Sequence, residues 1–328
     1  MKNLTRRAVL TLLASAAAFP AMAAGGEALP AAFPQKPLTL IVPFSAGGPV
    51  DVLGRLLAQE YAVRFGQAAI VENKTGGAGN IGIEVVRKAT PDGTTLLLIP
   101  AGNLTINPTL MPNLSFNVER DFTPIALLAS APNVMVVSPK LGVTSIKQLI
   151  EKSRTTKLSY GSPGVGSQLH LAMELFKEKA GVEILHVPYR GSSQALGDVL
   201  GDHIDVLVTN LPAALSAIKG NLVIPLAMTT AQRSPLVPQV PTLEESGVAG
   251  IDVTSWYGML APRAIPNDVR DAIFSVTRDI LEEPGLREKL LAQGLSVKIE
   301  PPQQFSERIR RETAQWAAVI KSRHITIQ

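Results

Sequence analysis

The sequence predicts an α/β protein built from two lobes. From residue 38 onward, short apolar runs alternate with stretches of helical periodicity, a pattern typical of a parallel α/β sheet. Two strand-to-helix junctions, far apart in the chain, are rich in glycine, which suggests one such junction in each lobe. The 328 residues include 46% hydrophobic residues and no cysteine, so a large apolar core must hold the fold without disulfides. This composition excludes disordered chains, collagen-like repeats and disulfide scaffolds.

The first 23 residues have the three parts of a secretory signal peptide. Lys2, Arg6 and Arg7 form a positive start, residues 8–19 are mostly apolar, and Ala21-Met22-Ala23 resembles a cleavage site. The apolar run is too short for a stable transmembrane helix, although a retained anchor is the alternative interpretation. The pair Arg6-Arg7 also resembles a twin-arginine signal, so the export route stays open.

The positive net charge lies mostly in this leader. The chain has 31 Lys and Arg residues against 27 Asp and Glu residues, a formal net charge of +4. Without the three leader cations, residues 24–328 would carry 28 against 27. We therefore expect a nearly neutral, soluble protein in a bacterial periplasm, with no nucleic-acid partner.

Secondary structure is expected in a regular order after a linker at residues 24–36, which are rich in Ala, Gly and Pro. Strands are expected at 38–42, 69–71, 94–99, 133–138, 157–160, 183–187, 204–208, 222–228 and 254–260. Helices are expected at 51–65, 81–89, 143–153, 167–180, 193–200, 267–282 and 302–321. Leu53, Leu57 and Tyr61 share one face of the first helix, and Pro91-Asp92-Gly93 marks a turn.

The first glycine-rich junction, residues 43–51, has the composition of an anion site. Gly47 and Gly48 allow the backbone to curve, so that free N–H groups are expected to point into one concavity. Pro49 suits the first turn of a helix because its missing N–H is not needed there. A loop followed by a helix N-terminus can bind an anion without a cationic side chain. The alternative is a glycine turn that only connects a strand to a helix.

The second junction, residues 160–167, repeats this arrangement. Ser167 is a suitable N-cap for a helix that has Leu169, Met173 and Phe176 on one face. If each lobe presents one helix N-terminus, a carboxylate could be held between them by backbone dipoles.

A third glycine cluster matches the dinucleotide-binding pattern G-x-G-x-x-G through Gly77, Gly79 and Gly82. That pattern requires an acidic residue about 20 positions later for the ribose. No Asp or Glu occurs between Gly93 and Val118, which argues against a nucleotide cofactor.

Catalytic and metal-binding patterns are weak. There is no G-x-S-x-G or Walker A motif, and His170, His186, His203 and His324 lack zinc-site spacing, so each is interpreted as a packing or surface residue. We expect no cofactor, no metal and no enzymatic activity. Asp51 and Asp205 are interpreted as helix-start and turn residues, although an enzyme that uses one of them stays an open alternative.

Several ordered blocks resemble one known family. These blocks are Val42–Gly48, Glu72-Asn73 with 76–82, 91–94, 160–167 with His170-Leu171, 186–191, and 255–258 with Ala261-Pro262. They are similar to those of the Bug-type periplasmic solute-binding proteins of tripartite tricarboxylate transporters. The resemblance extends from about residue 34 to the C-terminus.

The resemblance implies a type II periplasmic-binding-protein fold, in which two α/β lobes with a hinged cleft close on a ligand like a Venus flytrap. Residues 37–135 with 255–328 would form lobe 1, and residues 136–254 would form lobe 2. Such a receptor binds a small carboxylate, partly through ordered waters, and passes it to integral-membrane permease subunits; we expect a monomer. The implied ligand-binding residues are Phe44, Ser45, Ala46, Gly47, Gly48, Asn103, Gly164, Gly166, Ser167, Thr209 and Asn210.

The chain also departs from the family pattern. Arg190 replaces a common Lys, and Val208-Thr209 replaces an aromatic or acidic pair before Asn210. In the family, the pair at 208–209 lies in the part of the cleft that recognises the distal end of the ligand, so the identity of the carboxylate stays open. A periplasmic sensor that docks to a signalling receptor, or an enzyme on the same fold, are the alternative functions.

Overall fold

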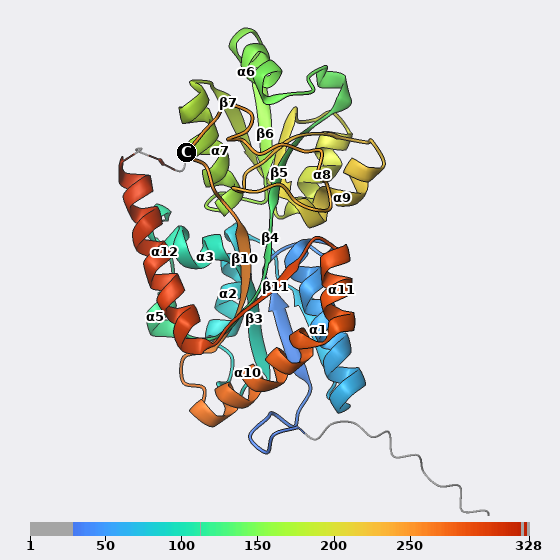
Figure 1. The fold of residues 1–328 in the computed structure, drawn as a ribbon. Coiled ribbons are helices and arrows are strands. Elements are labelled where there is room, and N and C mark those ends of the chain that lie inside the picture. The colour runs from blue at the N-terminus through green and yellow to red at the C-terminus, as the bar shows by residue number, and fades with distance from the viewer. Residues whose placement is uncertain (1–28, 112, 323–324, 327–328) are drawn as a thin grey trace, which may run out of the picture.

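The structure, a computed structural model, describes residues 29–111, 113–322 and 325–326. The predicted signal peptide lies outside the described residues. Two β-sheets, each with helices on both faces, form two lobes that are stacked along the long axis of the molecule (Figure 1).

The first lobe is built on a six-stranded sheet in the order β11-β4-β10-β3-β1-β2. Its strands are β1 (Leu38–Val42), β2 (Ala69–Asn73), β3 (Thr95–Pro100), β4 (Phe122–Ala131), β10 (Ser255–Pro262) and β11 (Ser296–Glu300). Its helices are α1 (Pro49–Phe65), α2 (Asn80–Arg87), α3 (Ala101–Thr105), α4 (Asn107–Leu110), α5 (Val118–Asp121), α10 (Asn267–Glu282), α11 (Pro284–Ala292) and α12 (Pro302–Ser322), with 3-10 turns η1 (Gly77–Gly79) and, in the second lobe, η2 (Pro139–Leu141).

The apolar side chains of the first sheet alternate between two cores. Leu96 and Leu98 pack with α1, α10 and α11 on one face, while Leu97 and Ile99 pack with α2 and α12 on the other. This is the period-two alternation of a strand that is covered on both faces. Because β1 and β3 run parallel to each other, the loops that follow them lie at the same end of the sheet.

The second lobe is built on a five-stranded sheet in the order β7-β6-β8-β5-β9. Its strands are β5 (Asn133–Val137), β6 (Leu158–Ser162), β7 (Ile184–Pro188), β8 (Val206–Asn210) and β9 (Ile224–Met228). Its helices are α6 (Ile146–Thr155), α7 (Gln168–Ala180), α8 (Ser192–Leu200) and α9 (Leu211–Lys219). Side chains of α6 and α7 belong to one core and those of α8 and α9 to another, so both faces are covered here too.

The expected elements are present within a few residues of their predicted bounds, but the pairing of strands differs from an all-parallel sheet. β1 pairs in parallel with β2 and β3, whereas β10 runs antiparallel to β3 and β4, and β5 runs antiparallel to β8 and β9. The reversal arises because these strands lie beside the points where the chain crosses between the lobes. The pattern of residues 122–131 predicts no strand, because this segment contains Pro124 and lacks alternation, yet β4 occupies Phe122–Ala131.

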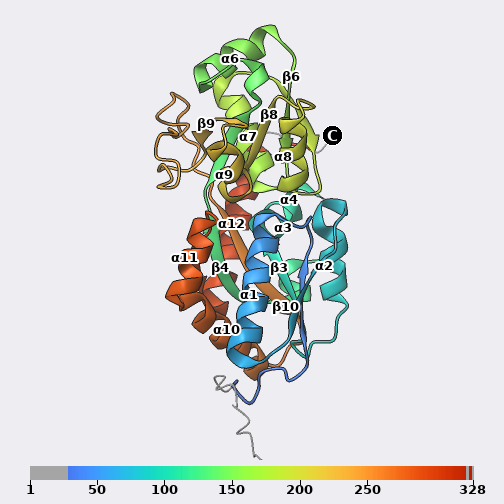
Figure 2. The same cartoon turned by 90° about the vertical axis from the view of Figure 1, so that its right-hand side faces the viewer.

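The chain crosses between the lobes twice. It leaves the first sheet at Pro132, between β4 and β5, and returns through residues 229–254, an irregular segment drawn in orange beside β9 in Figure 2. The two crossings are joined, because the Asn133 side chain donates a hydrogen bond of 2.9 Å to the carbonyl of Val253.

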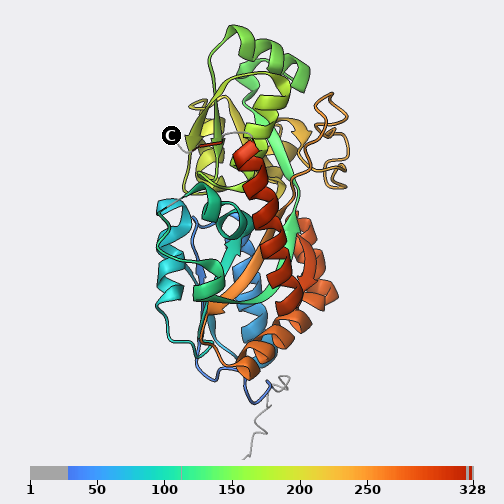
Figure 3. The same cartoon turned by 90° about the vertical axis from the view of Figure 1, so that its left-hand side faces the viewer.

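Helix α12 and the segment before β1 tie the molecule together. Figure 3 shows α12 lying along the first lobe and reaching the second, where Trp316 and Val319 pack against its core. Phe33 lies within the predicted linker, yet its ring is buried and its centroid lies 5.9 Å from that of Tyr61.

Among the described residues, no helix combines the length and apolar character needed to cross a bilayer.

Candidate functional site

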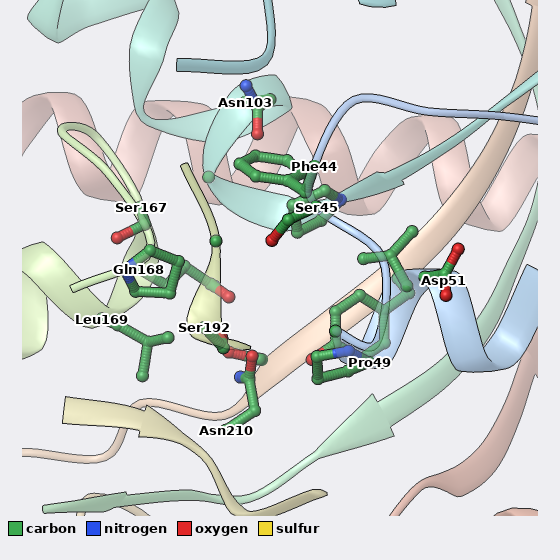
Figure 4. A pocket seen from close by; sticks show the side chains of 18 residues that line it. Phe44, Ser45, Pro49, Asp51, Asn103, Ser167, Gln168, Leu169, Ser192 and Asn210 are labelled. Carbon is green, nitrogen blue, oxygen red and sulfur yellow. The ribbon is translucent and has the colours of Figure 1, made fainter. Parts of the chain in front are cut away.

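A small cavity lies between the two lobes. Its volume is about 50 Å³, space for roughly four water molecules. The first lobe lines it through the loop after β1, the start of α1 and parts of α3 and β10, and the second lobe lines it through the starts of α7, α8 and α9. Figure 4 shows the side chains around this space. The lobes are therefore closed against each other around the cavity.

The five-residue helix α3 begins at this cavity, at Pro100, and so do four longer helices of the described chain. Their N-cap residues, Gly48 of α1, Ser167 of α7, Gly191 of α8 and Asn210 of α9, all line it. Only Ser167 caps its helix with a side-chain hydrogen bond, accepted from the N–H of His170 at 3.1 Å. First-turn N–H groups have no partner within their own helix, and each N-terminus carries about half a positive charge.

No Lys, Arg or His occurs among the described residues that line the cavity. Positive potential at this site must therefore come from peptide groups. The arrangement suits an anion that accepts several hydrogen bonds in a small, enclosed space.

The loop after β1 is held in shape by Asp51, which is 2% exposed. Its carboxylate accepts hydrogen bonds of 2.9 Å from the Gly47 N–H, from the Asn73 side chain and from Arg55. Asn73 also donates to the carbonyl of Phe44 at 3.0 Å. Burial acts to raise the pKa of Asp51, but these hydrogen bonds outweigh it and hold the pKa below its ordinary value. The expectation of a free N–H is thus wrong for Gly47, because Asp51 already accepts from it.

Hydroxyl groups without hydrogen-bond partners lie at the cavity. Ser45 and Tyr257 line it, and their hydroxyl oxygens are buried without a partner among the described residues. Burial raises the pKa of Tyr257, so its phenol is neutral and can donate. A buried polar atom without a partner costs about 1–3 kcal/mol, a cost that a polar ligand would remove.

The structure divides the eleven sequence-predicted residues into two groups. Those that line the cavity are Phe44, Ser45, Gly48, Asn103, Ser167 and Asn210. Those that do not line it are Ala46, Gly47, Gly164, Gly166 and Thr209. Thr209 precedes the lining residue Asn210 in the chain, and its hydroxyl is buried without a partner among the described residues.

The second-lobe glycines bond within their own loop. The Gly164 N–H donates to Ser162 Oγ at 3.3 Å, and the Gly166 N–H donates to His170 Nδ1 at 3.4 Å. Ser162 Oγ in turn lies 2.7 Å from Nε2 of His186. These glycines therefore shape the loop, while the cavity itself is lined by Ser167 and the residues after it.

His170 and His186 stack with their ring centroids 4.2 Å apart. Burial is the main cause that lowers the pKa of His170 to about 4 and that of His186 to about 3, so both rings are neutral at neutral pH. The sequence indicates no relation between them, because their contact depends on the packing of α7, which carries His170, against β7, which carries His186. Among the described residues, no group of three His, Asp or Glu side chains could hold a metal ion.

Other cavity residues were not predicted, including Ser192, Ser255 and Tyr257. Tyr257 lies within a block that carried the family resemblance, so that block was the available signal. Ser192 follows Gly191 at the start of α8, and the glycine before a helix was the signal there.

Glycines permit the close approach of the lobes. A Cβ at Gly102 of α3 would lie 2.6 Å from the carbonyl oxygen of Gly166, on the other lobe. A Cβ at Gly191 would lie 2.3 Å from Ser45 Oγ. One backbone hydrogen bond also crosses the cleft, from the Ser45 N–H to the carbonyl of Arg190 at 3.4 Å.

Comparisons with known proteins agree on one family. A sequence profile described as "Tripartite tricarboxylate transporter family receptor" matches residues 53–325. The chain is similar to the periplasmic binding protein BugD, with 31% identity and a TM-score of 0.85 over 90% of this chain and 100% of that one. It is also similar to Rpa4515 of R. palustris, solved with adipate, with 33% identity and a TM-score of 0.85 over 89% and 99%. MatC of Rhodopseudomonas palustris, solved with bound malate, gives 28% identity and a TM-score of 0.82 over 88% and 100%.

Proposed function

Since the chain belongs to the family of tripartite tricarboxylate transporter receptors, we propose that it is an extracytoplasmic receptor that binds a small carboxylate in the cavity between its lobes and delivers it to the permease subunits of such a transporter. The family resemblance and the fold class predicted from the sequence are confirmed. Members of this family are periplasmic solute-binding proteins, and their fold serves solute capture rather than catalysis.

The convergence of four helix N-termini on a cavity without cationic side chains carries the proposal of a carboxylate ligand. Burial of a carboxylate is costly unless hydrogen bonds replace its water. The first turns of α1 and α8, whose N-caps make no side-chain hydrogen bond, can supply N–H groups, whereas in α9 the Leu211 N–H already donates to the carbonyl of Pro132 at 2.8 Å. Adipate and malate occupy relatives of similar structure, which supports this class of ligand. We propose contacts from Ser45, Gly48 and Ser167 to the carboxylate.

Closure of the lobes is the second part of the proposal. We keep the predicted ranges, 37–135 with 255–328 and 136–254, as the bodies that move. A ligand that contacts both lobes binds the closed state better and shifts the population toward it. The contact of Gly102 with Gly166 would form only on closure.

A charge placed at the first loop tests the site. A Cβ at Gly48 would lie 3.5 Å from the nearest heavy atom, the carbonyl of Ser45, so a side chain fits there. Gly48→Asp should abolish carboxylate binding in isothermal titration calorimetry, because its negative charge faces the anion. Gly48→Asn has the same size without the charge and should bind far more tightly than Gly48→Asp. Equal affinities in the wild type and Gly48→Asp would mean that the loop is only a connector.

The ligand itself can be found with a panel of mono-, di- and tricarboxylates in a thermal-shift assay. The protein is first unfolded and refolded to remove any ligand that copurified with it. If no carboxylate in the panel raises the melting temperature, the proposed function is wrong.

Delivery to a membrane partner is tested separately from binding. Uptake of the labelled ligand by cells should require both this chain and the permease subunits. A chain that binds the carboxylate but is dispensable for uptake would favour the sensor alternative.

Export and oligomeric state also belong to the proposal. We expect the mature chain to begin at Ala24 and to be a monomer. N-terminal sequencing of the protein from the periplasmic fraction and light scattering after gel filtration measure these properties, and an intact Met1 or a dimer would contradict them.

A further inference from the structure

One buried amide lies where the two crossings between the lobes meet. Asn133 is the first residue of β5, directly after Pro132, and it is fully buried. Its backbone pairs with Asn210, the last residue of β8, while Ser255, the first residue of β10, pairs with Ala131. Asn133 therefore lies at the boundary between the two sheets.

The amide of Asn133 is fixed in one orientation. Its Nδ2 donates to the carbonyl of Val253 at 2.9 Å, and because a carbonyl can only accept, the atom that faces Val253 must be the nitrogen. Its Oδ1 accepts two hydrogen bonds, from Asn210 Nδ2 at 2.7 Å and from the Ser255 hydroxyl at 2.8 Å. Both lone pairs of this oxygen are then used.

The two donors to this oxygen line the cavity between the lobes, whereas Asn133 itself does not. Asn210 is the N-cap of α9 and belongs to the second sheet, and Figure 4 shows it among the side chains around the cavity. Ser255 belongs to the first sheet. A single oxygen atom thus holds one cavity residue from each sheet.

Further hydrogen bonds connect Asn133 to both ends of the returning segment, residues 229–254. The Thr229 N–H donates to the carbonyl of Asn133 at 3.0 Å, and the Val253 N–H donates to the carbonyl of Thr229 at 2.9 Å. The Thr229 hydroxyl donates to the carbonyl of Val253 at 2.8 Å. The position of Asn133 is therefore determined by both crossings, and its side chain transmits that position to the cavity.

Hydrogen bonds give this junction a defined geometry that apolar packing alone would not give. A buried amide is costly unless its polar groups are paired, and an apolar side chain could fill the same space without that cost. A fully paired amide fixes distances and directions, because its bonds are strong only within a narrow range of both. Side chains that contact a ligand must be held to within about 0.5 Å, which is the role of buried residues behind them.

We infer that Asn133 is a positioning residue of the ligand site, which fixes Asn210 and Ser255 for the closed, carboxylate-bound state without contacting the ligand. This inference rests on the proposed function and deepens it, because it assigns the coupling between the hinge and the cavity to one side chain. The affinity for the ligand then depends on the arrangement of the crossings.

A matched pair of variants tests the inference by isothermal titration calorimetry. The probe is malate, adipate or whichever acid of the thermal-shift panel binds the wild type most tightly. Asn133→Ala removes the acceptor of both cavity residues and should weaken binding about tenfold or more. Thr229→Val removes a donor to the same Val253 carbonyl but no bond to a cavity residue, so it should change the affinity by about twofold or less. Equal affinities in the wild type and Asn133→Ala, or equal losses in both variants, would overturn the inference.

A double-mutant cycle separates positioning from general destabilisation. If Asn133 acts through the cavity residues, its replacement by Ala should cost at least about threefold less affinity in Ser255→Ala than in the wild type, because one positioned side chain is already absent. The same loss in both backgrounds would overturn the assignment. Circular dichroism and thermal melting show whether each variant folds.

Hydrogen exchange in the wild type decides the inference if Asn133→Ala does not fold. A ligand that requires the intact network must stabilise it, so the bound acid should slow exchange of the Thr229 and Val253 N–H groups about tenfold or more. Unchanged exchange at both groups would overturn the inference.

Failure of the inference is distinguishable from failure of the proposed function. If no carboxylate binds the wild type, both are overturned together. If a carboxylate binds and its affinity is the same in Asn133→Ala, the inference alone is overturned.

Discussion

Asp51 illustrates how one buried carboxylate can hold the shape of a loop at the cavity between the lobes. It fixes Gly47 and Asn73, and through Asn73 the carbonyl of Phe44. Its own charge is balanced by Arg55, whose side chain is 55% exposed. The residue therefore orders the loop, while the helix N-termini provide the potential.

Removal of the Asp51 carboxylate should destabilise the protein. Asp51→Ala leaves the Gly47 N–H and the Asn73 amide without their acceptor, and should lower the free energy of unfolding by about 2–3 kcal/mol in urea denaturation. Arg55→Ala is the matched control, with an expected loss below about 1 kcal/mol because that side chain is half exposed. Similar losses in both variants would mean that Asp51 stabilises the protein through its ion pair with Arg55 and not through its hydrogen bonds to the loop.

The histidine pair makes stability depend on pH. Burial lowers the pKa of His170 to about 4 and of His186 to about 3, below the ordinary value of 6.5. A lowered pKa contributes stability that is fully present above pH 6.5 and is lost as pH falls toward the folded-state values. His170→Gln should therefore show a smaller decrease in the free energy of unfolding between pH 6.5 and 4 than the wild type. Parallel pH profiles for the two proteins would contradict this assignment.

At the scale of single residues, the sequence could predict positions that follow strands and precede helices, such as Ser45, Gly48 and Ser167. It could not predict Tyr257 as a residue with a free hydroxyl, because that depends on which groups lie opposite it across the cavity. The stacking of His170 on His186 likewise follows from the packing of α7 against β7.

At the scale of elements, helices rather than side chains make the site. The sequence predicted the starts of α1 and α7 from glycine-rich loops and a suitable cap. It did not predict α9, although Asn210 was named through the family resemblance. A run such as Leu211–Lys219, which is mostly apolar, has no clear helical period. Strand β4 was missed for a related reason, since burial on both faces removes alternation.

The close contact of α3 with the loop before α7 gives a prediction about closure. Gly102→Ala places a Cβ 2.6 Å from the carbonyl of Gly166, and should weaken ligand binding about tenfold or more while the unfolding free energy changes little. Gly285→Ala in α11 has open space around the new Cβ and should leave affinity unchanged. Tight binding by Gly102→Ala would mean that the lobes do not need this contact to hold the ligand.

At the scale of the whole molecule, the two lobes are joined by two crossing segments and by α12. The sequence indicated two lobes through its paired glycine-rich junctions, whereas the antiparallel strands at the crossings depend on long-range topology. A ligand bound between the lobes contacts both and is lost when either unfolds. Binding must therefore stabilise the molecule as a unit.

The stabilisation of the whole molecule by its ligand can be measured as an increase in the free energy of unfolding. A carboxylate at 100 times its Kd should raise the free energy of unfolding by about 2.7 kcal/mol, observed as a higher melting temperature in calorimetry. The same concentration should not change the melting temperature of Gly48→Asp, because this variant keeps the fold but its added negative charge opposes the carboxylate. A shift in that variant would show that the stabilisation comes from elsewhere on the surface.

The uncapped helix ends at the cavity have a consequence for the conditions under which the receptor works. Peptide groups cannot be deprotonated, so above about pH 5, where His170 and His186 are neutral, the recognition surface keeps one charge state. The affinity should then change with pH in proportion to the ionised fraction of the free solute. A receptor of this kind would bind only the ionised form of its solute. When the medium becomes more acidic, its occupancy would fall even if the total solute concentration stays constant.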